Sequence, residues 1–177
     1  MRYLKTFLFL LCLLPGGVWA GLEMGQVPSP VELKDQLGGR LDGSPWSSRE
    51  MQGKVHVLFY VDPDVKDLNN EASDALSAAK FPRDKFQSLA IINMAATWLP
   101  NFAISSSLKE KQEAYPTTLY LRDLKKVLVE KWGIADDNSD VLAFDQQGRL
   151  IFRKDGQLNE EEIKKLLQLI REHIDRK

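Results

Sequence analysis

The sequence predicts a single α/β domain in which a mixed sheet is covered by helices on both faces. Residues 54–61 form an apolar run rich in β-branched and aromatic side chains, which is typical of a strand covered on both sides. Strand and helix patterns alternate after this run, and the alternation indicates parallel neighbours joined by right-handed crossovers. The chain ends in an antiparallel hairpin followed by an amphipathic helix, so the sheet is expected to be mixed.

The elements can be placed in chain order. An extended segment at 21–30 precedes a short hairpin across 31–41 with Gly38 and Gly39 at its turn, the strand 54–61, a helix from Leu68 to Ala79, a strand at 86–94, a helix from Pro100 to Tyr115 and a strand at 117–121. Residues 125–133 fit either a short strand or a turn of helix, and 135–140 form an acidic loop. A hairpin at 141–153 then leads to a final helix that Asn159 and Glu162 cap reciprocally.

The first 20 residues have the pattern of a secretory signal peptide. A basic start and the apolar run 7–14 precede small residues at the predicted cut between Ala20 and Gly21. That run is far shorter than the roughly 20 residues that span a bilayer. We therefore predict that residues 1–20 are removed and that 21–177 form one domain without membrane contact.

Composition narrows the chemistry of such a secreted chain. The one cysteine, Cys12, lies inside the predicted signal peptide, so the mature protein would have no thiol. Disulfides, thiol redox chemistry and thiolate metal sites are then excluded. Removing Arg2 and Lys5 from the 24 basic residues leaves 22 against 25 acidic ones, a net charge of about −3. A mild acidic excess without a basic stripe argues against nucleic-acid partners and anionic membranes.

Several stretches resemble known extracytoplasmic families. LDGSPWSS at 41–48, GKVHVLFY at 53–60, DQQGRLI at 145–151 and GQLNEE at 156–161 resemble thioredoxin and peroxiredoxin-like (TlpA-like) proteins. AKFPRDKFQ at 79–87, IINM at 91–94, and SSSLK at 105–109 with Tyr115-Pro116 resemble the YtfJ-type bacterial proteins. This resemblance covers nearly the whole mature chain. It implies a thioredoxin-like α/β/α sandwich of three layers with an N-terminal β-hairpin, in the periplasm of a Gram-negative bacterium.

The same resemblance implies that the redox chemistry of the fold is missing. In redox-active thioredoxin-like proteins a Cys-x-x-Cys motif begins the helix after the central strand, where the helix N-terminus lowers the thiol pKa. On that pattern Asp64 and Asp67 occupy the cysteine positions, and Ser139 falls at the position of the cis-proline. Pro116 matches an earlier strand start and is expected to be trans. We therefore expect no thiol oxidoreductase or peroxidase activity, and no enzyme activity of another kind.

The acidic residues near this position have two interpretations. The simpler one is that Asp64 and Asp67 cap the following helix and complement its dipole. In the other, oxygen ligands from the motif position and the acidic loop hold Ca²⁺ or Mg²⁺. The candidate metal ligands are Asp64, Asp67, Asp136, Asn138 and Asp140. Against a calcium loop, Val141 stands where such a loop requires glycine.

Apolar and histidine side chains near the same sheet end also have competing uses. Trp98, Leu99 and Phe102 would most simply be buried in the core. If they are exposed, they form a patch for a peptide or protein beside the vacant motif position. His56 lies within the central strand and is expected to be packed there rather than to act as a ligand or base.

These observations predict a secreted periplasmic, thioredoxin-like protein without redox cysteines that acts as a peptide-binding, protein-binding or accessory module. Its partner would be a periplasmic protein or peptide that the sequence does not identify, and no cofactor is expected. The alternative is a divalent-metal-binding protein or metal-dependent enzyme that uses the acidic cluster. Transcriptional regulation, a label that some members of the resembled family carry, would require the chain to stay in the cytoplasm.

Overall fold

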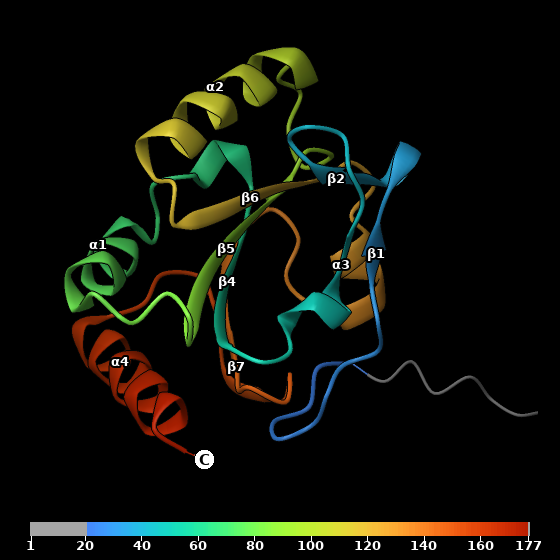
Figure 1. The fold of residues 1–177 in the computed structure, drawn as a ribbon. Coiled ribbons are helices and arrows are strands. Elements are labelled where there is room, and N and C mark those ends of the chain that lie inside the picture. The colour runs from blue at the N-terminus through green and yellow to red at the C-terminus, as the bar shows by residue number, and fades with distance from the viewer. Residues whose placement is uncertain (1–20, 177) are drawn as a thin grey trace, which may run out of the picture.

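A six-stranded mixed sheet forms the centre of the structure, a computed structural model that describes residues 21–176 (Figure 1). Its strand order is β2-β6-β5-β4-β7-β8. In that order the strands are Gly38–Arg40, Thr118–Asp123, Phe86–Asn93, Val55–Val61, Ser139–Phe144 and Leu150–Asp155. The predicted signal peptide, with Cys12 and Ala20, lies outside the described residues.

The predicted central strand is β4, and the prediction is confirmed. It pairs parallel with β5 and antiparallel with β7, so the sheet is mixed. All seven of its residues are buried. Val57 and Phe59 face one hydrophobic cluster, while Leu58 and Tyr60 face the other, as the alternation of side chains along a strand requires.

Helices and the N-terminal segment cover the two faces of this sheet. The helices α1 (Asn70–Ala79), α2 (Asn101–Ala114) and α4 (Glu160–Ile174) pack on one face. The short helix α3 (Val127–Trp132) and the N-terminal strands pack on the other. Figure 1 shows α1, α2 and α4 together on one side of the sheet and α3 with β1 on the opposite side. The predicted three-layer α/β/α architecture is therefore present.

Helix α4 follows its sequence signals closely. The side chain of Asn159 accepts from the backbone N–H of Glu162, and the Glu162 carboxylate accepts from the N–H of Asn159, both at 2.9 Å. This reciprocal capping satisfies two N–H groups that a helix start otherwise leaves free. The apolar stripe of the helix buries Leu166, Ile170 and Ile174 against the sheet. Among the described helices, none combines the length and apolar character needed to cross a membrane.

The N-terminal hairpin is antiparallel, but its predicted turn was wrong. The pairing joins β1 (Glu32–Leu33) to β3 (Trp46–Ser47), and a 3₁₀ turn at Asp35–Leu37 follows β1. Gly38 and Gly39 instead form part of β2, which pairs antiparallel with β6. A Cβ on Gly38 would lie 2.0 Å from the carbonyl oxygen of Arg122, so the position requires glycine because two backbones meet there.

The segment after β6 is helical, which settles the open choice at 125–133. The buried carboxylate of Asp123 accepts from the N–H groups of Val127 at 2.9 Å and Leu128 at 3.0 Å, and from the hydroxyl of Tyr60 at 3.1 Å. These bonds satisfy the start of α3 and fix it to the sheet. The acidic loop is shorter than predicted, because Ser139 and Asp140 already belong to β7.

Candidate functional site

A cleft separates α1 from α2, and strands β4, β5 and β6 form its floor. Its inner part has a volume of about 280 Å³ and an apolar floor of Phe59, Ala90, Ile92 and Tyr120. Phe59, Ala90 and Ile92 are 8%, 9% and 7% exposed. Leu58, Leu89 and Ile91, which alternate with them and face α3, are 0%, 1% and 0% exposed. The sheet is therefore less completely covered on the cleft side.

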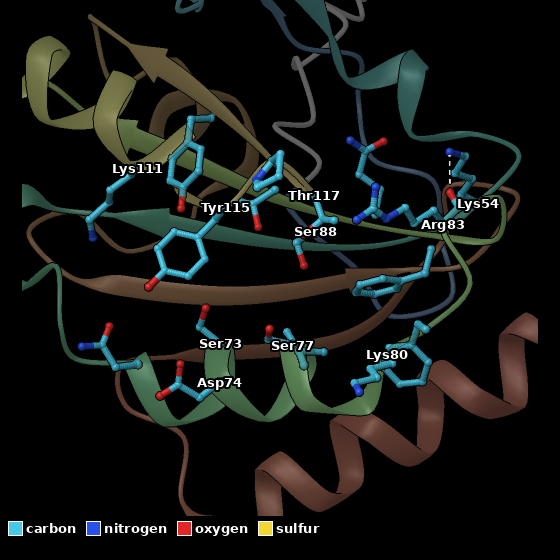
Figure 2. A pocket seen from close by; sticks show the side chains of 18 of the residues that line it. Lys54, Ser73, Asp74, Ser77, Lys80, Arg83, Ser88, Lys111, Tyr115 and Thr117 are labelled. Atoms are coloured by element: carbon cyan, nitrogen blue, oxygen red, sulfur yellow. Dashed lines mark hydrogen bonds between the residues drawn. The ribbon is translucent and has the colours of Figure 1, made fainter. Parts of the chain in front are cut away.

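The outer part of the cleft is larger, about 900 Å³, and it is polar. The two parts adjoin, because Ser73, Ser88, Lys111 and Tyr120 line both. Figure 2 shows Ser73 and Ser77 of α1 directed across this space toward Ser88 and Tyr115. Hydroxyl groups thus line both walls of the outer part, and a bound ligand could hydrogen-bond to either wall.

Neighbours of Asp64 and Asp67, the residues that the family resemblance places at the redox-motif position, line the inner part. Pro63 and Lys66, from the turn after β4, line the cavity together with Ser139 at the start of β7. No peptide bond between residues 21 and 176 is cis, so Pro116 is trans as predicted.

Asp64 and Asp67 do not cap the helix, so the simpler interpretation of them was wrong. A 3₁₀ turn at Pro63–Val65 follows β4, and Asp62 caps it by accepting from the N–H of Asp64 at 2.8 Å. Helix α1 begins only at Asn70. Asp64 accepts from the hydroxyl of Thr97 at 2.9 Å, and Asp67 accepts from the side-chain amide of Asn70 at 3.2 Å. Asp64 therefore ties the turn to the segment that carries Trp98.

The five predicted metal ligands do not converge. Asp136 accepts from Lys126 at 2.6 Å and from Asn93 at 2.9 Å, which lowers its pKa although burial acts in the opposite direction. The side chain of Asn138 accepts from the N–H of Ser139 at 2.9 Å. Asp140 is fully buried within β7. Within the described part of the chain, no group of three or more His, Cys, Asp or Glu side chains could hold a metal ion.

Asn69, which no sequence pattern indicated, links the start of α1 to two distant segments. Its side-chain NH₂ donates to the carbonyl of Ser139 at 3.1 Å, to the hydroxyl of Ser139 at 3.0 Å and to the carbonyl of Gly156 at 3.2 Å. Its oxygen accepts from the N–H of Leu158 at 3.0 Å. The cleft wall at α1 is thus held to β7 and to the segment before α4. All these partners are remote in the chain, so no local pattern identifies the residue.

Two buried titratable groups with shifted pKa values, His56 and Asp140, line neither part of the cleft. His56 is 4% exposed, its Nδ1 lies 3.0 Å from the carbonyl of Lys54, and burial lowers its pKa to about 4. This confirms the prediction of a packed histidine. Asp140 has no hydrogen-bond partner for either oxygen within residues 21–176. Burial, with a smaller effect from Asp155, raises the pKa of Asp140 to about 7.

The apolar side chains at the cleft mouth are exposed, so the expectation that they are buried in the core was wrong. Trp98 is 87% exposed, Phe102 is 79% exposed and Leu99 is 37% exposed. Helix α2 buries Ile104 and Leu108 instead, and Phe102 in its first turn is exposed. Leu99 also lines the inner cavity. We refer to Trp98, Leu99 and Phe102 as the apolar patch.

Comparison with known proteins identifies the family. Residues 32–173 match the family described as a bacterial protein of unknown function (YtfJ_HI0045). The chain belongs to this family. It is 29% identical over 178 residues to the uncharacterized protein YtfJ of Escherichia coli, a match that covers 94% of this chain and 96% of that protein. It is 28% identical to an uncharacterized protein of Haemophilus influenzae, with the same coverage of both chains.

Solved structures similar to this YtfJ-family chain are thioredoxin-like. A thiol-disulfide isomerase from Corynebacterium glutamicum has a TM-score of 0.58 and 14% identity, and the match covers 85% of this chain and 98% of that one. The exposed lipoprotein thioredoxin Etrx1 of Streptococcus pneumoniae has a TM-score of 0.54 and 18% identity, covering 80% and 99%. These likenesses show the fold. With one cysteine in the chain, a Cys-x-x-Cys pair cannot form, which argues against thiol redox activity.

Proposed function

We propose that this YtfJ-family protein is a secreted, non-redox binding module of the bacterial periplasm that holds a segment of a peptide or protein in the cleft between α1 and α2. One observation carries the proposal. The inner part of the cleft borders the residues after β4 that are predicted to replace the redox motif, and Phe59, Ala90 and Ile92 on its floor are 7% to 9% exposed. Ligands of open α/β sheets commonly bind beyond the carboxyl ends of the strands, which is where the residues after β4 lie.

The chemistry of the inner part suits an apolar side chain. Binding pockets for small groups are mostly apolar, with a few polar groups that set orientation. Here Phe59, Ile92 and Leu108 supply the apolar surface, and Asn70 and Ser73 supply polar groups at the wall. A volume of about 280 Å³ would accommodate a large side chain with part of its backbone.

The apolar patch extends this surface beyond the cavity. Trp98 and Phe102 are large, rigid and mostly exposed, and aromatic residues of this kind dominate binding energy at protein interfaces. Leu99 connects them to the cavity, because it lines the inner part. A ligand that placed one side chain in the cavity could therefore continue across the patch.

Photocrosslinking in living cells tests the binding role. A photoreactive phenylalanine analogue would replace Ala103, which lines the cavity, or Phe102 of the patch. The control position is Lys165, which is exposed on α4. We expect discrete crosslinked products from positions 102 and 103 and none from 165. Equal crosslinking at all three positions, or none at any, would contradict the proposal.

Cell fractionation tests the secretion that the proposal includes. The protein should be released with the periplasmic fraction, and mass spectrometry should find its N-terminus at Gly21. A cytoplasmic protein that retains residues 1–20 would refute the periplasmic part of the proposal while leaving the crosslinking result to stand on its own.

A further inference from the structure

The outer part of the cleft carries more basic than acidic side chains. Its lining includes Lys54, Lys80, Arg83 and Lys111 against Asp67 and Asp74. Lys66 adds a further basic residue at the inner part. The whole chain, by contrast, has 24 basic and 25 acidic residues. The cleft is therefore a local concentration of positive charge on a nearly neutral protein.

These cations form no ion pairs with carboxylates of the described residues. Lys66, Lys80, Arg83 and Lys111 take part in none of the ion pairs formed among residues 21–176. Some basic side chains outside the cleft are paired, as Lys154 is with Glu162 at 2.7 Å, and others are not. Lys54 donates to the backbone carbonyl of Arg83 at 2.8 Å, which fixes the loop that carries Arg83 at the cleft (Figure 2). The site is thus complementary to an anion.

The polar lining indicates the kind of anion. The outer walls present hydroxyl groups of Ser73, Ser77 and Ser88, and the side-chain amides of Asn70 and Gln87. A peptide backbone offers one donor and one acceptor at nearly every residue and could pair with these groups. An acyl chain could not, and covering polar groups without partners is unfavourable.

We propose that the cleft selects acidic peptides: an extended segment with an apolar side chain on the floor of Phe59 and Ala90, and carboxylates beside Lys80, Arg83 and Lys111. This inference rests on the proposed function and adds the chemistry of the ligand. The charged side chains are at least partly accessible to solvent. Their contribution to affinity should therefore weaken as salt concentration rises.

Two pools of synthetic peptides test the inference. In both pools a central apolar position is leucine, phenylalanine or valine. In one pool glutamates flank this position on its N-terminal and C-terminal sides, and in the other pool glutamines do. Retention on the immobilised protein, measured by mass spectrometry, should favour the glutamate pool by about tenfold at low salt, and the preference should shrink in about 0.5 M salt. The double variant Lys80→Gln with Arg83→Gln should lose most of the preference.

The matched control is Lys109→Gln with Lys165→Gln, which has the same net charge but alters exposed positions that do not line the cleft. It should retain the preference. Equal retention of the two pools, still sensitive to Ala90→Phe in the floor, would overturn the acidic preference and leave the proposed peptide-binding function standing. Retention of neither pool, with palmitate bound instead, would overturn this inference and the peptide assignment together.

Discussion

The two faces of the central sheet differ in how completely they are covered, and the difference is opposite to what helix length suggests. The face under α3 has a six-residue helix, yet Leu58, Leu121 and Leu142 are each 0% exposed. The opposite face has helices of 10, 14 and 15 residues, yet it contains the cleft. The indoles of Trp46 and Trp132 explain the close coverage of the α3 face, since both are almost fully buried there.

This comparison indicates that the two faces of the sheet have different roles. On the α3 face the buried carboxylate of Asp123 is satisfied through α3 and Tyr60, whereas Asp140, on the same side of β7 as Leu142, has no hydrogen-bond partner within residues 21–176. The cleft face leaves hydroxyl groups and lysines directed at open space. We therefore assign stability mainly to the first face and binding to the second, and each assignment predicts a different response to substitution.

The largest expected effect on stability comes from replacing a buried tryptophan by alanine, compared with the same replacement of an exposed one. Trp132 is fully buried, and its Nε1 donates to the carbonyl of Ser29 at 2.8 Å. Trp132→Ala should lower the free energy of unfolding by about 4 kcal/mol because it leaves a cavity. Trp98→Ala, at an 87% exposed position, should change it by less than about 0.5 kcal/mol. Urea unfolding measures both, and similar losses would refute the distinction.

Asn69→Ala should have the next largest effect, because the cleft wall depends on its hydrogen bonds. The substitution leaves the N–H of Leu158 and the carbonyls of Ser139 and Gly156 without this partner. We expect a loss of about 3 kcal/mol in the free energy of unfolding. Hydrogen exchange should also show earlier opening of α1 than in the wild type. Asn70→Ala is the control, since the Asn70 side chain is exposed and bonds only to Asp67 within the described residues.

Two buried groups, His56 and Asp140, should affect the pH dependence of stability in opposite directions. The pKa of His56 falls from 6.5 to about 4 in the fold, so its contribution is present above pH 6.5 and is lost as the pH falls toward 4. The pKa of Asp140 rises from 3.8 to about 7, so its contribution is present below pH 3.8 and is lost as the pH rises through 7.

The two groups make unfolding free energy change with pH in opposite directions, so their effects partly cancel in the wild type. A variant that lacks one group should show the pH dependence of the other. Between pH 6.5 and 4, Asp140→Asn should lose about 2 kcal/mol of unfolding free energy through His56, and His56→Gln should gain about 2 kcal/mol through Asp140. Urea unfolding at several pH values measures both. Parallel profiles of the two variants would contradict the assigned shifts.

A smaller effect distinguishes the cleft floor from the sheet beneath α4. Ala90 is 9% exposed and Ala143 is 0% exposed, although both face the same hydrophobic cluster. Ala143→Val should cost about 1 to 2 kcal/mol through overpacking, whereas Ala90→Val should be tolerated within about 0.5 kcal/mol. Thermal unfolding of the pair measures the difference, and an equal cost would mean that the cleft floor has no room.

How far the fold could be predicted depends on the range of the interactions involved. The strand at 55–61 and the helix capped by Asn159 carry local signals, namely an apolar run and a capping box, and both were predicted. Gly38 was misinterpreted as a turn residue because a close approach to Arg122 leaves the same glycine signature as a turn. The role of Gly38 depends on a strand distant in the sequence, so the residues around it do not reveal it.

The candidate site was less predictable for the same reason. Family resemblance predicted a redox-motif position at Asp64 and Asp67, but the capping role expected of them was wrong, since the 3₁₀ turn at Pro63–Val65 delays the start of α1. Asn69 has partners in two distant segments. The exposure of Trp98 depends on which face α2 buries, and that choice follows from Ile104 and Leu108.

The central claim is that ligands bind the cleft face and not the α3 face. The most direct measurement is the change in backbone amide chemical shifts of the isotopically labelled protein on addition of the glutamate peptide pool. We expect shifts concentrated at Ser73, Ser88, Ala90 and Tyr120, with Leu128, Trp132 and Phe144 unchanged. Shifts concentrated around α3, with the cleft residues unchanged, would contradict this claim.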